Sequence, residues 1–106
     1  MSETSFIIYL DDVQENRYRH WHVWHEGKIT EFVIQYEAWI AGKWHPVLRY
    51  DSAHGYPHRD ILHLDGTQTK GIFQNYSYAE VLTLGQQDIA DNWVIYRTSY
   101  LKEVKR

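Results

Sequence analysis

Hydrophobic and polar residues alternate along much of residues 18–51, which is the pattern of strands with one buried face. Every second residue from Phe32 to Ile40 is apolar, so this run predicts a half-buried strand. Gly27 and Gly42 interrupt the alternation and tolerate the positive φ of hairpin turns. The region therefore predicts an antiparallel meander of three strands. The inward face of its third strand is expected to carry Trp44, Leu48 and Tyr50.

The first strand of this meander carries tryptophan on both faces and two histidines on one of them. A period of two places Trp21 and Val23 on one face, with His20, His22 and Trp24 on the other. Two histidines on one face are compatible with a bound metal or, beside Trp24, with a nucleic-acid groove. The pattern is more typical of the exposed face of a strand.

The segments on either side of the meander predict shorter elements. Residues 5–10 form an apolar run that fits a strand or a short helical turn. The polar residues 52–60 are expected to form a loop. Residues 61–64 and 70–73 then predict two further strands, joined by a turn at Asp65-Gly66.

Beyond Ser77 the apolar spacing becomes helical. Ser77 and Glu80 have the form of a capping box, which marks the start of a helix. The apolar positions that follow are Tyr78, Val81, Leu82, Ile89, Trp93, Tyr96 and Tyr100. They predict one long helix, or two helices broken near Gly85, packed on the sheet. The basic residues that complement the helix dipole at its end are Lys102, Lys105 and Arg106. Residues 1–106 are therefore predicted to form one α+β domain, an antiparallel β-meander with a C-terminal helix packed on one face.

Composition narrows the class of protein. The chain has 106 residues and a mass of 12.8 kDa, enough for one modest core. A formal net charge of -3 provides no global basic field, so any contact with RNA requires a local patch. Without cysteine there is no disulfide or thiolate zinc site, and no run approaches the roughly 18 apolar residues of a membrane span. A soluble cytoplasmic protein with no membrane partner is expected. Five Trp and nine Tyr exceed the needs of so small a core, which predicts an aromatic surface groove.

Residues 49–66 concentrate the side chains that are able to carry chemistry. Three histidines, His54, His58 and His63, lie there beside several aspartates and two arginines. Imidazoles with carboxylates are able to hold zinc or another divalent ion. The spacing matches no strong metal motif, and Pro57 argues against a helix that would bring two of the histidines together. A metal-free site without a cofactor is therefore the expectation.

The same residue types suit metal-independent cleavage of RNA. That reaction needs a base for the 2′-hydroxyl, an acid for the leaving oxygen and a cation for the phosphorane charge. Residues of these types are His54, His58, His63, Arg49 and Arg59. The candidates for substrate binding, by base stacking or hydrogen bonding, are Tyr50, Tyr56 and Asp51.

A purely structural role is the alternative for this segment. Asp51 with Ser52 is able to cap a turn, and the two arginines are able to pair with neighbouring aspartates. His63 lies between Ile61 and Leu64 and fits an ordinary strand position.

The order of these residues resembles a known family. A strand that ends in Arg49-Tyr50-Asp51, then His54, Pro57-His58 and a turn at Asp65-Gly66, is similar to the small toxins of bacterial toxin–antitoxin pairs of the TumE type and to allied uncharacterised families. The resemblance implies a compact α+β protein made beside an antitoxin and acting on RNA, with His54 and His58 at the polar centre of the site. It departs from the pattern at Arg59, where a further histidine is expected, and in the acidic net charge.

Two hypotheses follow. The first is a metal-independent endoribonuclease, the toxin of such a pair, with His54 and His58 as acid and base and Arg49 or Arg59 holding the phosphate. Its partners would be RNA and a cognate antitoxin, and a homodimer is compatible with it. The second is a non-catalytic binding or protein-interaction domain with an aromatic-rich sheet.

Overall fold

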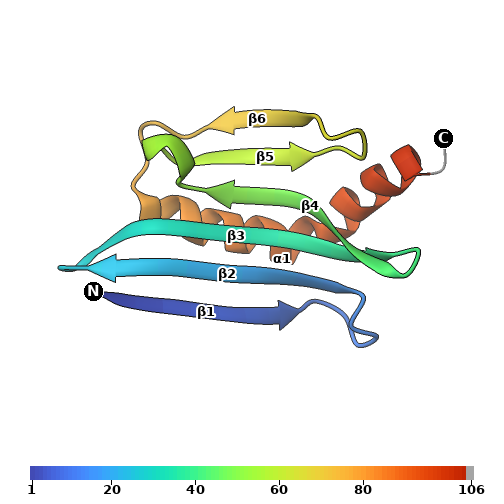
Figure 1. Cartoon of the computed structure of the whole chain (residues 1–106), viewed down its shortest axis with the longest axis horizontal. Coiled ribbons are helices and arrows are strands. Elements are labelled where there is room, and N and C mark those ends of the chain that lie inside the picture. The colour runs from blue at the N-terminus through green and yellow to red at the C-terminus, as the bar shows by residue number, and fades with distance from the viewer. Residues whose placement is uncertain (105–106) are drawn as a thin grey trace.

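The computed structural model describes residues 1–104, which form one six-stranded antiparallel sheet followed by a long helix (Figure 1). The strands lie in the sheet in chain order, so each strand pairs with its neighbours in sequence. Their bounds are β1 Ser2–Tyr9, β2 Asn16–His25, β3 Lys28–Ile40, β4 Lys43–Asp51, β5 His58–Leu62 and β6 Gln68–Ile72. A short 3-10 turn, η1 Ala53–Gly55, separates β4 from β5, and the helix is α1 Tyr78–Val104. The predicted α+β class, a meander with a C-terminal helix on one face, is confirmed.

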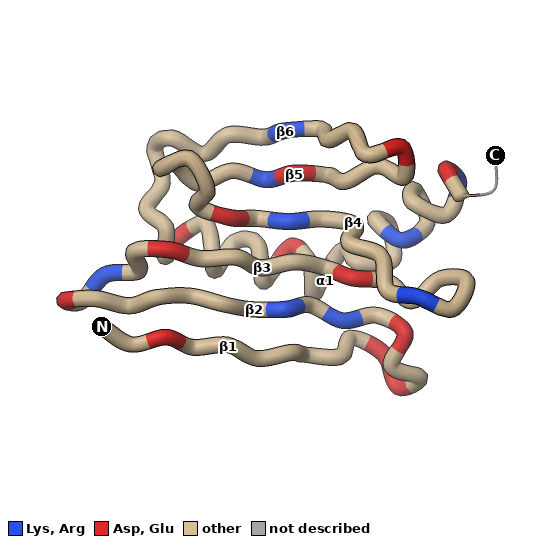
Figure 2. Tube along the Cα trace, viewed as in Figure 1, with Lys and Arg blue, Asp and Glu red and all other residues tan. Residues whose placement is uncertain are grey.

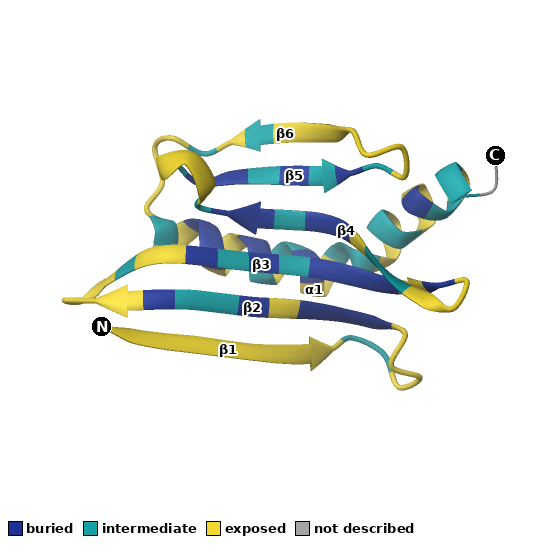
Figure 3. Ribbon diagram, in the orientation of Figure 1, coloured by how far each residue is buried: buried dark blue, intermediate teal, exposed yellow. Residues whose placement is uncertain are grey.

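The helix covers the middle of the sheet on one side only. It packs on β3 and β4, and Figure 1 shows it behind these strands. The alternation predicted for β3 is confirmed, because Phe32, Ile34 and Tyr36 are fully buried under the helix together with Leu48 and Tyr50 of β4. Figure 3 shows the same division, with buried positions concentrated in β3 and β4 while β1 is exposed along its length.

The helix is continuous through Gly85, so the single-helix alternative is confirmed. Its start is the predicted capping box: Glu80 N–H donates to Ser77 Oγ over 3.1 Å, and Ser77 N–H donates to Glu80 Oε1 over 2.9 Å. Lys102 lies in the last turn, whereas Lys105 and Arg106 lie outside the described residues. Within residues 1–104 this helix has no apolar stretch of the length needed to cross a membrane.

Trp44 lies on the opposite face from the one predicted. The pairing of β3 with β4 shifts by one residue between Tyr36 and Glu37, which leaves Val47 as an extra residue in β4. Such a bulge reverses the alternation on one side of it. Leu48 therefore faces the helix as predicted, while Trp44 contacts Trp39 edge-to-face on the other face, with ring centroids 5.3 Å apart.

The predicted loop 52–60 is shorter in the structure. Strand β5 begins at His58, three residues before the predicted start at Ile61, and His58 pairs directly with Asp51 of β4. A search for alternating apolar residues does not find a strand whose buried residues are polar and bonded to one another. This difference decides the geometry of the candidate site.

Candidate functional site on the open face of the sheet

The face of the sheet turned away from α1, here called the open face, carries two neighbouring rows of side chains. Residues that pair across strands share a face, so the strand register places each row. The charged row consists of Ile7, Arg19, Gln35, Arg49, Asp60 and Lys70, one from each strand in order. The Trp–His row beside it consists of Ser5, Trp21, Val33, Asp51, His58 and Ile72. Figure 2 shows where the acidic and basic residues lie along the strands of the sheet.

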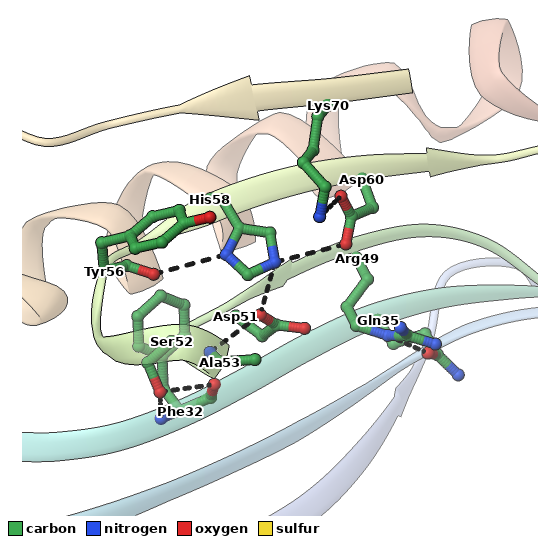
Figure 4. Close-up of polar contacts among 10 residues, drawn as sticks. All are labelled: Phe32, Gln35, Arg49, Asp51, Ser52, Ala53, Tyr56, His58, Asp60 and Lys70. Atoms are coloured by element: carbon green, nitrogen blue, oxygen red, sulfur yellow. Dashed lines mark hydrogen bonds and ion pairs between the residues drawn. The ribbon is translucent and has the colours of Figure 1, made fainter. Parts of the chain in front are cut away.

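His58 is enclosed by acceptors, as Figure 4 shows. Its Nε2 lies 2.9 Å from Asp51 Oδ1 and 3.3 Å from Asp60 Oδ2, and its Nδ1 lies 3.3 Å from the carbonyl oxygen of Tyr56. The His58 residue is 2% exposed, and both aspartates are also buried. We call Asp51, His58 and Asp60 the Asp–His–Asp cluster. Its members come together because β4 and β5 pair antiparallel, and Asp60 is two residues beyond His58 on the same face.

Hydrogen bonding assigns a fixed role to this imidazole. A carbonyl oxygen and ionised carboxylates only accept, so both ring nitrogens of His58 are satisfied when both carry a proton. The ammonium of Lys70, whose Nζ lies 3.4 Å from Asp60 Oδ1, adds an ion pair to the cluster. Without an added ion, His58 therefore anchors β4 to β5.

Glu37 accepts hydrogen bonds from several side chains at the end of the open face away from His58. It accepts from Arg17 Nε over 2.7 Å, from Arg19 Nε over 3.0 Å and from Gln35 Nε2 over 2.7 Å. Burial by itself raises the pKa of Glu37, but these hydrogen bonds outweigh it, so the pKa lies below its ordinary value of 4.5. Gln35 also accepts from Arg49 Nε over 2.8 Å, which links the two ends of the face.

Two adjoining hollows lie along the Trp–His row. The first, of about 460 Å³, is lined on β1 to β3 by both rows, including Arg19 and Gln35. The second, of about 410 Å³, reaches η1 and is lined by Asp51 and His54 among others. Trp21 and Val33 line both hollows. We call the two hollows together the Trp21 groove, which extends from the edge of the sheet to the histidine turn.

His54 is the accessible histidine of this turn. It is exposed, and its backbone has a φ of 70°, in the left-handed region that non-glycine residues rarely adopt. The His54 ring centroid lies 6.2 Å from that of His58 and 6.4 Å from that of Tyr56. Gln14, Glu26 and Ala41 also have positive φ in other turns, so this backbone conformation shapes the turn, and the candidacy of His54 depends on its exposure beside His58 and Tyr56.

The structure brings together only part of the predicted site. Asp51, His54, Tyr56 and His58 lie at one end of the open face, and Arg49 lies in the adjacent charged row.

Tyr50 and Arg59 lie on the helix side instead, because each is one residue away from an open-face position. Tyr50 is buried and donates to Asp88 Oδ2 over 2.6 Å, and both Tyr50 and Arg59 border a hollow beside Asp88. Burial raises the pKa of Tyr50, and the Asp88 carboxylate raises it further. His63 lies apart from both groups, bonded to Glu103 over 2.9 Å and to Thr69 over 2.7 Å.

The face of β2 that was expected to be exposed is partly buried. His20, expected on an exposed face, is buried: it stacks on Phe6 with centroids 4.3 Å apart and contacts His22 over 2.7 Å between ring nitrogens. Burial, followed by the nearby His22, lowers the pKa of His20. The groove uses Trp21 and Arg19 of the opposite face. The alternation of β2 places Trp21 and Arg19 on one face, and a strand beginning at His58 would have aligned that face with Asp51 and His58.

Comparison of the sequence with known proteins identifies a family but no activity. A family model described as a domain of unknown function, DUF7718, matches residues 1–106. No curated protein and no solved structure matches the chain.

Proposed function

This chain belongs to the DUF7718 family, and we propose that it binds single-stranded RNA in the Trp21 groove and cleaves it beside His54, acting in the cytoplasm as the toxin of a toxin–antitoxin pair. The observation that carries the proposal is the groove itself. An aromatic ring lies between two hollows, a half-exposed arginine, Arg19, borders one of them, and an exposed histidine, His54, borders the other.

Single-stranded nucleic acid is recognised by stacking bases on aromatic rings and by cations that contact the backbone. Trp21 supplies the ring, and Arg19, with 53% of its side chain exposed, supplies the cation. The groove carries one basic side chain, Arg19, and two acidic residues, Glu31 and Asp51, so in this scheme stacking on Trp21 would contribute more to affinity than charge. Aromatic stacking is tolerant of sequence, so recognition would depend on an unpaired strand more than on particular bases.

Cleavage in this scheme is proton transfer by His54. The imidazole takes the proton of a 2′-hydroxyl, the freed oxygen attacks the adjacent phosphorus, and the bond to the 5′-oxygen breaks as that oxygen takes a proton from solvent. Arg49, two residues before Asp51 in the charged row, would offset the charge that develops on the phosphate oxygens, while Arg19 at the first hollow would contact the backbone further along the strand. His58 keeps the turn in place through Asp51 and the Tyr56 carbonyl.

Binding is tested by replacing Trp21 with alanine. Loss of one stacked base, worth about 1–3 kcal/mol, corresponds to a dissociation constant raised roughly 5- to 150-fold. Fluorescence anisotropy with a labelled unstructured RNA measures this. Trp24→Ala is the matched control, because Trp24 lies on the same strand, points to the opposite face and is 47% exposed. Equal affinities of the two variants would contradict the proposed groove.

Cleavage is tested separately with His54→Ala. RNA degradation and growth arrest on expression should both disappear, while RNA affinity stays within about twofold of wild type because stacking supplies most of it. His63→Ala is the control histidine, since His63 is bonded to Glu103 away from the groove. A protein that binds RNA but arrests growth equally with and without His54 would instead be a non-catalytic binding domain.

A further inference from the structure

We infer that the Asp–His–Asp cluster is a binding site for one divalent transition-metal ion, with Asp51, His58 and Asp60 as its ligands. The inference goes beyond the proposed RNA cleavage and does not depend on it. It also differs from the three-histidine site considered from the sequence, because His63 lies elsewhere and a second aspartate, Asp60, completes the set.

The spacing of the three side chains fits a coordination sphere. One atom from each residue lies within 4.8 Å of the other two, and Nε2 of His58 is 2.9 Å and 3.3 Å from the two carboxylate oxygens. Metal–ligand bonds of about 2.0–2.2 Å separate neighbouring ligand atoms by about 3.0 Å at octahedral angles and about 3.4 Å at tetrahedral ones. An ion between the three groups therefore needs little movement of the strands.

Hydrogen bonding within the cluster is incomplete without an ion. The Nε2 atom of His58 has a single proton to share between Asp51 and Asp60. Asp60 is 3% exposed, and its Oδ1 accepts no hydrogen bond from any residue in 1–104, having only the ion pair with Lys70 at 3.4 Å. Buried carboxylate oxygens are costly when unsatisfied. A cation in place of the imidazole proton would bind Asp51 Oδ1 and Asp60 Oδ2 at once, while Asp60 Oδ1 would keep its ion pair with Lys70.

The chemistry of the donor set indicates the kind of metal. One imidazole with two carboxylates suits Mn²⁺, Fe²⁺, Co²⁺ or Zn²⁺, whereas Ca²⁺ and Mg²⁺ prefer oxygen ligands throughout. Supporting contacts are present around the ligands. His58 Nδ1 is able to donate to the Tyr56 carbonyl, the outer bond that orients metal-binding histidines, and Ala53 N–H donates to Asp51 Oδ1 over 3.1 Å.

Metal binding would also change the charge of the open face. A divalent ion between Asp51, His58 and Asp60 would add positive charge to a cluster that holds two aspartates. The face would then offer an added positive charge beside His54, whose ring lies next to that of His58.

The test uses the full chain, freed of metal with a chelator, without RNA. Titration with Co²⁺ should give one ion per chain, a visible d–d absorption band and a melting temperature that rises with the logarithm of Co²⁺ concentration. His58→Gln and Asp60→Asn should abolish the band, while His63→Gln should retain it. Trp21→Ala should also retain it, which separates this inference from RNA binding.

A measurement on the wild type guards against variants that fail to fold. X-ray absorption of the Co²⁺ or Zn²⁺ form should fit one imidazole nitrogen together with oxygen ligands. The inference is overturned if the wild-type protein binds none of Co²⁺, Mn²⁺ and Zn²⁺. It is also overturned if the X-ray absorption spectrum requires two or more imidazole ligands, or if folded His58→Gln keeps the d–d absorption band of Co²⁺ unchanged.

Discussion

Replacing Glu37 with alanine is expected to lower the free energy of unfolding by about 3–5 kcal/mol, because it leaves a buried charge without its partner. Arg17 is 9% exposed, and its Nε lies 2.7 Å from Glu37 Oε1. The Arg17 guanidinium also lies 3.7 Å from the centre of the Trp44 ring, which holds it in place when the carboxylate is removed. Arg19 and Gln35 lose their acceptor at the same time.

Urea unfolding of both proteins measures the difference. The matched control is Glu31→Ala, which makes the same change at an exposed position of the same strand and should alter stability by no more than about 0.5 kcal/mol. Glu37→Gln, which keeps the volume and one acceptor oxygen but removes the charge, should fall between them. Equal losses for Glu37→Ala and Glu31→Ala would show that the open-face network does not stabilise the fold.

The contribution of Glu37 should also depend on pH. Its pKa is lower in the folded chain than the ordinary value of 4.5, so the folded state binds the proton less readily than the unfolded state. The stabilisation is therefore complete above pH 4.5 and is lost as the pH falls through the pKa of the folded state. The stability difference between wild type and Glu37→Gln should shrink over that acidic range and stay constant near neutrality.

The elements that sequence reasoning predicted correctly are those whose local pattern is uninterrupted. Every second residue of strand β3 from Phe32 to Ile40 is apolar, and α1 combines helical spacing with a capping box at Ser77. Both signals come from one stretch of chain and need no knowledge of its neighbours. Trp44 was misplaced because a bulge is a property of two paired strands and leaves no mark in the alternation of either one.

The candidate site was predicted in its residue types but not in its grouping. Asp51, His54 and His58 do lie together, whereas Arg59 was placed beside them by sequence proximity although it points to the helix side. The polar start of β5 was taken as loop because buried polar residues stabilise each other only through long-range pairing. Once β5 begins at His58, its alternation alone assigns Asp60 to the site and excludes Arg59.

The Trp21 groove could not be predicted from the local sequence for a different reason. Trp21 and Arg19 are ordinary strand residues by pattern, and they become a site only when the register aligns them with Gln35 and Asp51 of later strands. Register is set by the lengths of hairpins and by bulges, which the sequence shows only in part. The aromatic surplus in the composition pointed to a groove without locating it.

Gly85→Ala is expected to destabilise the protein by about 1–3 kcal/mol, although alanine is normally the better helix former by about 1 kcal/mol. A Cβ at this position would lie 2.8 Å from the Cγ and Cδ1 atoms of Tyr50 and 3.1 Å from Ile34 Cγ2. The Tyr50 ring is 1% exposed and its hydroxyl is bonded to Asp88 of the helix, so it cannot turn aside without breaking that bond. The helix must then move away from β3 and β4, which loosens the packing of the whole core.

Thermal or urea unfolding checks this, with Gly71→Ala as the matched control. A Cβ at Gly71 would contact the Arg59 side chain only at ordinary distances of 3.7 Å and beyond, so that substitution should be nearly neutral. In the double variant Gly85→Ala with Tyr50→Leu, the smaller side chain should relieve part of the clash, giving a coupling energy of opposite sign to the two losses. A Gly85→Ala protein more stable than wild type would mean that the helix lies further from Tyr50 than described. It would then contradict the close packing of Tyr50 against the helix.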